Sequence, residues 1–214
     1  MEDIVIIGAG GFGREVAWLI EEINDFEKTW NLKGFLDAKK LIGEVVNDYP
    51  VLGDISWLSE HKHVKTVVAI GDPVSRKKIV QKLAASQITF ATIIHPDTKI
   101  HASVQIGTGS IICKGTILTV NINIGQHVIL NLDSTVGHDV NLEDYITVFP
   151  SCNISGFVKV GQISLIGTGT QIIQEITIGD NVYIGAGAVV NRDIPDNSLA
   201  VGVPAKVIKS RNVL

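Results

Sequence analysis

The sequence predicts a chain with two architectures, an α/β unit with a doubly wound sheet followed by a prism of short stacked strands. Two patterns carry this prediction. Strand-like and helix-like segments alternate over the first ninety residues, as they do in doubly wound sheets. From Ile94 onward an aliphatic residue recurs at every sixth position, a period that fits neither an α-helix nor a single alternating strand.

The N-terminal unit begins with a buried strand over residues 4–7, which runs directly into a glycine-rich loop. A second strand is expected over 32–36 and a third over 66–70, with a second helix over 75–86. The first helix follows the loop and is amphipathic, with apolar residues at Val16, Leu19, Ile20 and Ile23.

The glycine-rich loop has the spacing G-x-G-x-x-G, at Gly8, Gly10 and Gly13. Glycines let the backbone approach a phosphate closely, and the N-terminus of the following helix offers free N–H groups to it. Asp37, at the end of the second strand, is placed to accept hydrogen bonds from a ribose or a base. Because only three or four strands fit before the repeats, we expect a mononucleotide or a nucleotide-sugar rather than NAD.

The six-residue repeat holds its phase over 17 positions from Ile94 to Val190, all of them Ile, Leu or Val. We expect these side chains to point into a triangular prism, with three hexapeptides forming one coil of 18 residues and nearly six coils in all. Glycine often follows the aliphatic residue, as at Gly107 and Gly125, and is expected to let the chain turn each corner. A β-sandwich would need turns every 8 to 12 residues and would not hold this phase.

Composition and charge exclude several classes of protein. With 18 basic and 22 acidic residues the net charge is −4, so we expect no nucleic-acid partner. Cys113 and Cys152 form no C-x-x-C pair, which favours a reducing compartment without disulfides or structural zinc. The apolar run near the N-terminus is too short for a signal peptide or a membrane span. We therefore expect a soluble, cytoplasmic protein.

The histidines of the prism do not gather into a metal site within one chain. Residues share a face when their repeats differ by multiples of three, so among His95, His101, His127 and His138 only His101 and His138 share one, two coils apart. No metal is therefore expected. A zinc triad built across subunits, as in the repeat-fold carbonic anhydrases, is the alternative.

One histidine is a candidate general base. Asp139 directly follows His138, and a neighbouring carboxylate can orient an imidazole and raise its basicity. The alternative interpretation is a surface histidine at a corner of the prism.

At this point the residues resemble a known family. The phase-locked repeats, "GHD" at 137–139 and "GVPAKVI" at 202–208 are similar to those of hexapeptide-repeat acyltransferases. With "IIGAGGFGREV", "GFLD" and "VVAIGDPVSRKKI" in front, the whole chain resembles bacterial sugar-nucleotide acetyltransferases, which include the bacillosamine-pathway (PglD-type) N-acetyltransferase and the sialic acid O-acetyltransferases.

This resemblance implies a fold and an assembly. The fold is an α/β Rossmann-like nucleotide-sugar-binding domain over residues 1–90, followed by a left-handed parallel β-helix over 91–214 that binds acetyl-CoA and carries a C-terminal tail. The assembly is a homotrimer in which acetyl-CoA lies between two subunits.

The resemblance also assigns roles by position. His138 matches the catalytic base and Asp139 the carboxylate beside it. Where many members have a second histidine that contacts acetyl-CoA, nine residues after the base, this chain has Thr147. Substrate-binding positions are matched by Gly10, Gly11, Phe12, Asp37, Gly71 and Asn131. Further acetyl-CoA positions are matched by Gly156, Thr168 and Ala186.

The implied activity is transfer of an acetyl group from acetyl-CoA to the 4-amino group of a UDP- or dTDP-linked amino-deoxy sugar, a step of glycan biosynthesis. His138 would act as general base in a direct transfer, with neither cysteine acetylated. The alternatives are an O-acetyltransferase acting on sialic acid or a related sugar, a metal-dependent hydratase of the repeat-helix kind, and a nucleotide-sugar-binding module without catalysis.

Overall fold

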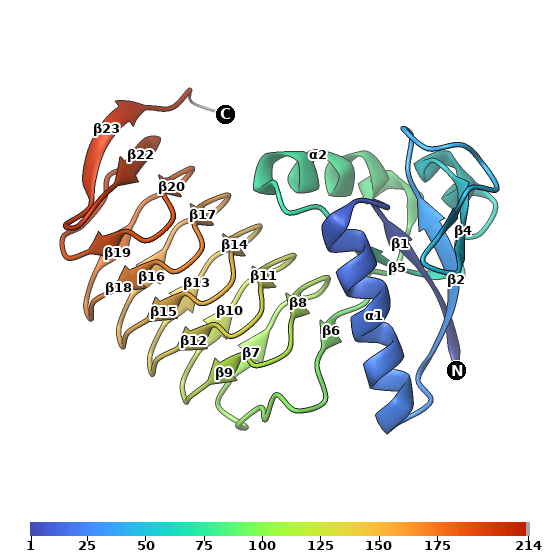
Figure 1. Cartoon of the computed structure of the whole chain (residues 1–214), viewed down its shortest axis with the longest axis horizontal. Helices are drawn as coiled ribbons and strands as arrows, with labels where there is room; N and C mark the ends of the chain where they lie inside the picture. Colours follow the sequence, from blue (N-terminus) through green and yellow to red (C-terminus); the bar gives the residue numbers. More distant parts are fainter. Residues whose placement is uncertain (213–214) are drawn as a thin grey trace.

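The computed structural model describes residues 1–212, so the last two positions of the predicted C-terminal domain, 213–214, lie outside the described residues. It has an N-terminal α/β unit and a stack of three-sided coils of short parallel strands (Figure 1). The predicted fold class, a Rossmann-like sheet followed by a left-handed parallel β-helix, is confirmed.

The N-terminal sheet has five strands in the order β3-β4-β2-β1-β5. They are β1 (Glu2–Ile7), β2 (Trp30–Leu36), β3 (Val45–Val46), β4 (Tyr49–Gly53) and β5 (Lys65–Val68). Strands β4, β2, β1 and β5 run parallel, whereas β3 forms an antiparallel hairpin with β4. The three predicted strands are confirmed. The expected total of three or four is too low, because Pro50 and Gly53 hide the strand pattern of β4.

Helices cover both faces of this sheet. They are α1 (Gly11–Phe26) and α2 (Pro73–Leu83), with two short 3-10 helices, η1 (Ile55–Ser59) and η2 (Ala84–Ser86). The predicted second helix over 75–86 is thus an α-helix followed by a 3-10 turn. The Asp72 carboxylate accepts a hydrogen bond from the Ser75 N–H (2.8 Å) and Pro73 is the first helical residue, so α2 begins where capping rules place it.

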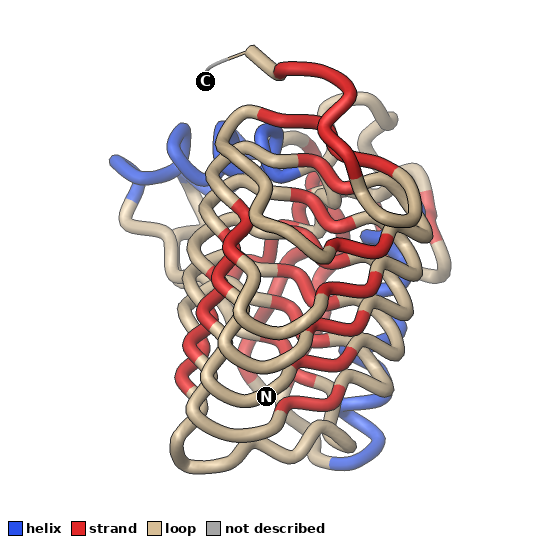
Figure 2. The backbone as a smooth tube through the Cα atoms, turned by 90° about the vertical axis from the view of Figure 1, so that its left-hand side faces the viewer, coloured by secondary structure: helices blue, strands red, loops and turns tan. Residues whose placement is uncertain are grey.

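The β-helix has three faces, and its strands stack in rows that Figure 2 shows along the coils. The face toward the N-terminal unit contains β6 (Ile93–Ile94), β8 (Ile111–Ile112), β11 (Ile129–Leu130), β14 (Thr147–Val148), β17 (Leu165–Ile166), β20 (Tyr183–Ile184), β22 (Ser198–Val201) and β23 (Lys206–Ser210). The second face contains β9 (Ile117–Leu118), β12 (Thr135–Val136), β15 (Asn153–Ile154), β18 (Gln171–Ile172) and β21 (Val189–Val190). The third contains β7 (Gln105–Ile106), β10 (Asn123–Ile124), β13 (Asn141–Leu142), β16 (Lys159–Val160) and β19 (Thr177–Ile178).

The aliphatic series fills the interior, as predicted, with one exception. From Ile112 to Val190 every member of the series is buried. Ile100 is 41% exposed and belongs to no strand, so its predicted inward position is wrong. Ile100 lies in the segment between β6 and β7, and the second face begins only with β9 in the following coil, so no strand pairing holds Ile100 inward.

The corners are built differently from the prediction. The glycines that directly follow the aliphatic residues, such as Gly125, have no positive φ. A Cβ on Gly125 would lie 2.5 Å from an Asp144 carboxylate oxygen and 2.7 Å from the Glu143 carbonyl carbon, so glycine is needed there because the next coil approaches closely. The left-handed conformation falls two residues later, as at His127 (φ 53°) and Asp139 (φ 60°).

The N-terminal unit packs on the first face of the β-helix. Ile93, Ile111 and Ile129 point outward from this face and are fully or almost fully buried in one cluster with residues of α1 such as Val16 and Ile20. Figure 1 shows α1 between the sheet and the coils. The two units therefore share an apolar junction.

A single buried arginine reinforces this junction. Arg76 of α2 is fully buried, and its Nη1 donates to the carbonyls of Ile70 (2.6 Å) and Gly71 (3.2 Å) at the end of β5. Its other donors reach the coils, with Nε on His127 O (2.9 Å) and Nη2 on Tyr145 O (2.8 Å) and Ile146 O (3.1 Å). Burial lowers the pKa of Arg76 to about 9, which leaves it charged at neutral pH.

Replacing Arg76 by methionine tests how much its hydrogen bonds contribute to the free energy of unfolding. The Arg76→Met variant leaves buried carbonyls without a donor and is expected to lose about 2 to 4 kcal/mol of unfolding free energy in urea. The matched control is Lys78→Met, an exposed lysine of the same helix, which should change stability by less than about 0.5 kcal/mol. Equal effects of the two substitutions would contradict the role of Arg76.

Candidate active site

The carboxyl ends of the parallel strands line one edge of the N-terminal sheet. Because the strands lie in the order β4-β2-β1-β5, the residues that follow them are ordered Asp54, Asp37, the glycine-rich loop and Gly71. A cavity of about 780 Å³ runs along this edge. Crevices at the carboxyl ends of such strands are where doubly wound sheets bind ligands.

The glycine-rich loop leaves the start of α1 open to an anion. Within residues 1–212 no side chain caps α1 and its first turn contains no acidic residue, so the N–H groups at its start are available to an anion, and Gly11 and Phe12 of this turn line the cavity. A Cβ on Gly13 would lie 1.9 Å from the Gly8 carbonyl oxygen, so the third glycine is required by close packing of the helix on the strand. Lys39 and Lys82 also line the cavity and supply positive charge.

Asp37 holds the loop in place. Its Oδ2 accepts a hydrogen bond from the Ala9 N–H (2.9 Å), and its Oδ1 accepts one from the Lys39 N–H (2.9 Å). The residue predicted to contact a ribose or a base thus also fixes the backbone that would bind phosphate.

A second pocket, of about 300 Å³, lies where the N-terminal unit meets the β-helix. It shares Phe12 and Gly71 with the first cavity and adds Asn131 and Thr147 from the coils. The structure therefore brings together, along one connected surface, the six residues predicted to bind substrate: Gly10, Gly11, Phe12, Asp37, Gly71 and Asn131.

Thr147 belongs to this junction. It is fully buried, and its hydroxyl donates a hydrogen bond to the Gly71 carbonyl (2.7 Å), which also accepts from Arg76. Its predicted contact with acetyl-CoA stays a prediction, and its hydroxyl hydrogen already has an acceptor within the protein.

His138 and Asp139 form a pair at another corner of the β-helix, directly after β12. The imidazole Nδ1 lies 2.8 Å from Asp139 Oδ2, and the Asn121 side-chain amide donates to Asp139 Oδ1 (3.2 Å). The His138 side chain is 54% exposed, and within residues 1–212 its Nε2 has no hydrogen-bond partner. The carboxylate therefore orients the ring and leaves the second nitrogen free for a proton.

The position of the His138 ring is defined by its packing contacts. Phe157 contacts it edge to face, with ring centroids 5.0 Å apart. A Cβ on Gly156, one coil further on, would lie 2.6 Å from the imidazole Cε1. Glycine at 156 thus makes room for the imidazole, which is a structural reason for this residue beside its predicted contact with acetyl-CoA.

The predicted site residues are divided between two corners of the β-helix. Asn131 follows β11, and Thr168 and Ala186 continue the same corner after β17 and β20. His138 and Gly156 lie at the next corner, after β12 and β15. One chain alone does not bring the pocket that contains Asn131 and the imidazole of His138 to the same corner.

Other reactive groups are few. Within residues 1–212 no three His, Cys, Asp or Glu side chains are grouped so that they could hold a metal ion. Cys113 and Cys152 are buried and unpaired, and burial raises the pKa of Cys113 to about 12.

Within residues 1–212 no helix has the length and apolar character needed to cross a bilayer.

Sequence reasoning missed several residues of the cavity, including Asp54, Ile55 and Lys82. Asp54 was missed because β4 was not recognised. The apolar residues Val51 and Leu52 just before an acidic residue are the pattern that could have located it, as they did for Asp37.

Comparisons with known proteins agree with this architecture. The family model of the PglD N-terminal domain matches residues 3–83, and that of the bacterial transferase hexapeptide (six repeats) matches residues 157–192. The GDP-perosamine N-acetyltransferase of Escherichia coli O157:H7 is 30% identical over 198 residues, which are 92% of this chain and 81% of that protein.

Two solved structures superpose over almost the whole chain. PerB from Caulobacter crescentus, in complex with CoA and GDP-perosamine, has a TM-score of 0.87 at 32% identity and covers 98% of both chains. The acetyltransferase domain of PglB from Neisseria gonorrhoeae, in complex with acetyl coenzyme A, has a TM-score of 0.88 at 33% identity and covers 97% of this chain and 99% of that one. The predicted resemblance is confirmed, and the chain belongs to the acetyl-CoA-dependent hexapeptide-repeat sugar acetyltransferases that carry a PglD-type N-terminal domain.

Proposed function

We propose that the protein transfers the acetyl group of acetyl-CoA to the 4-amino group of a nucleotide-linked amino-deoxy sugar, with GDP as the carrier. The observation that carries this proposal is the connected surface from the glycine-rich loop to Asn131, which has room for a diphosphate at one end and a sugar at the other. The relatives named for GDP-perosamine favour GDP over the UDP or dTDP that the sequence led us to expect.

His138 acts in this proposal as the general base. As the sugar nitrogen attacks the thioester carbonyl, a C–N bond forms and the C–S bond breaks. Nε2 of His138 takes the proton from the nitrogen and returns it to the departing CoA thiolate. Asp139, 2.8 Å from Nδ1, keeps the proton of the neutral ring on that nitrogen and stabilises the imidazolium.

The site is completed in this proposal by a second copy of the chain, within a homotrimer. His138 and the substrate pocket lie at different corners, so the pocket of one subunit meets the imidazole of another. The corner of His138 is flanked by exposed apolar side chains at Ile117 (58%) and Phe157 (50%), which a partner would cover. Acetyl-CoA then lies between Thr168 and Ala186 of one subunit and Gly156 of its neighbour.

Two features support this reaction over its alternatives. The buried thiols are disfavoured as nucleophiles, since burial raises the pKa of both, which supports direct transfer over an acetyl-enzyme. The oriented His138–Asp139 pair is the arrangement that a catalyst needs and a nucleotide-sugar-binding module does not. An O-acetyltransferase acting on sialic acid would use the same base, and no observation favours it.

The acceptor is tested by measuring release of free CoA thiol from acetyl-CoA with a panel of sugars. The panel contains GDP-, UDP- and dTDP-linked 4-amino-4,6-dideoxy sugars beside free and CMP-linked sialic acid. We expect turnover with the GDP-linked amino sugar and at least tenfold lower kcat/KM with the others. Turnover with sialic acid alone, or silence across the panel, would contradict the proposal.

The base is tested by substitution. His138→Ala should lower kcat by a factor of about 10² to 10⁴ with little change in KM, because a general base acts in the transition state. Asp139→Asn should lose about 10- to 100-fold in kcat, since Asp139 orients the ring and stabilises the imidazolium but does not itself take the proton. His101→Ala, at an exposed histidine, is the matched control. Activity of His138→Ala within threefold of wild type would remove His138 from this role.

A further inference from the structure

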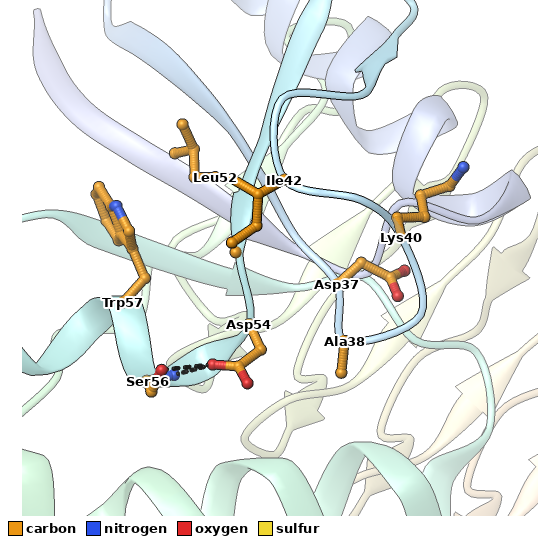
Figure 3. A pocket seen from close by; sticks show the side chains of 9 residues that line it. Asp37, Ala38, Lys40, Ile42, Leu52, Asp54, Ser56 and Trp57 are labelled. Carbon is orange, nitrogen blue, oxygen red and sulfur yellow. Dashed lines mark hydrogen bonds between the residues drawn. The ribbon is translucent and has the colours of Figure 1, made fainter.

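The nucleotide cavity continues past Asp37 to the end of β4. An adjoining pocket of about 390 Å³ lies there, and Figure 3 shows its side chains. Ile42, Leu52 and Trp57 give it apolar walls, and Asp54 contributes a carboxylate. The acetyl-transfer reaction itself requires no group in this pocket.

The order of the strand ends shows which part of a nucleotide-sugar reaches it. The sugar must lie toward Gly71 and Asn131, where the N-terminal unit meets the β-helix. The diphosphate lies at the glycine-rich loop, in the middle of the edge. The base is then directed to the opposite end, beyond Asp37, where β4 ends at Asp54.

Asp54 is oriented by its own turn. Its Oδ1 accepts hydrogen bonds from the Ser56 N–H (2.8 Å) and the Ser56 hydroxyl (2.6 Å). These bonds lower the pKa of the Asp54 carboxyl, so it is ionised at neutral pH. Within residues 1–212 no side chain or N–H bonds its Oδ2 and no cation pairs with it, so one oxygen of a fixed carboxylate is available to a ligand.

The neighbouring acidic residue does not have this freedom. Both oxygens of Asp37 accept backbone N–H groups, from Ala9 and Lys39, and Figure 3 shows its carboxylate turned away from Asp54. Trp57, on the other side of Asp54, is held by stacking on His61, with ring centroids 3.6 Å apart and an interplanar angle of 3°. The pocket thus combines a fixed acceptor with a fixed aromatic wall.

We propose that Asp54 selects guanine, with Oδ2 accepting hydrogen bonds from N1–H and the 2-amino group of the base. This inference rests on the proposed function. Guanine carries these two donors side by side on its Watson–Crick edge. Uracil and thymine carry one N–H between two carbonyl oxygens, and adenine and cytosine pair one amino group with an acceptor nitrogen. An ionised carboxylate oxygen repels those acceptors, whereas it forms strong charge-assisted bonds with adjacent donors.

The first test compares nucleoside diphosphates on the full-length wild-type protein by calorimetry. IDP differs from GDP by loss of the 2-amino group, so we expect GDP to bind about 10- to 100-fold more tightly than IDP, and UDP to bind more weakly still. Equal binding of GDP and IDP, or tighter binding of UDP, would overturn the role of Asp54. Absence of binding by any of the diphosphates would overturn the nucleotide-sugar function as well.

The second test exchanges the acceptor for a donor. In Asp54→Asn the side-chain oxygen stays on the Ser56 N–H, so the amide NH₂ replaces Oδ2. We expect GDP binding to fall about 10- to 100-fold. Binding of XDP, which has a 2-carbonyl group that the amide can donate to, should rise above its wild-type level. A gain of XDP binding cannot arise from partial unfolding, and Asn retains the cap of the turn.

The matched control is Asp25→Asn, an equal charge change at the far end of α1, which should leave the GDP, IDP and XDP affinities unchanged. If Asp54→Asn keeps the wild-type order of these affinities, Asp54 does not contact the base. The panel of amino sugars would still report whether the proposed acetyl transfer occurs, so the two proposals fail separately.

Discussion

The buried guanidinium of Arg76 is the contact on which the geometry of the site depends. The guanidinium links the segment after β5 to the coils, because it donates hydrogen bonds to the carbonyls of Ile70 and Gly71 on one side and of Tyr145 on the other. Gly71 lines both pockets, so a rotation between the two units would separate the proposed diphosphate region from the proposed sugar region. The Thr147 hydroxyl, on the same Gly71 carbonyl, adds a second tie.

The geometry of the β-helix explains why one chain holds two separate halves of the proposed site. Each coil returns to the same three corners every 18 residues, so Asn131 and His138 cannot share a corner however the chain is packed. The stacked coils position the imidazole through Phe157 and Gly156. Assembly of copies around the coils is then the simplest way to bring base, sugar and acetyl-CoA together.

The structural features that could be predicted from the sequence are those encoded by residues close together in the chain. The six-residue spacing of the aliphatic residues predicts the coils, and the G-x-G-x-x-G spacing between a strand and a helix predicts the glycine-rich loop. The role of the corner glycines could not be predicted from the sequence, because the atom that excludes a Cβ at Gly125 belongs to Asp144, in the next coil. The hydrogen bond from Thr147 to Gly71 spans 76 residues, and no local pattern encodes it. Asp54 was missed because Pro50 and Gly53 obscured the strand that places it.

Mixing two inactive variants tests whether the substrate pocket and the base come from different copies of the chain. Gly11→Asp places a negative charge at the proposed diphosphate site, and His138→Ala removes the proposed base. After subunit exchange at equal amounts, about a quarter of the interfaces in random mixtures pair an intact pocket with an intact imidazole. If the site is shared between copies, the mixture should recover about a quarter of wild-type activity. A mixture that stays as inactive as its components would place the whole site within one chain and rule out a site shared between copies.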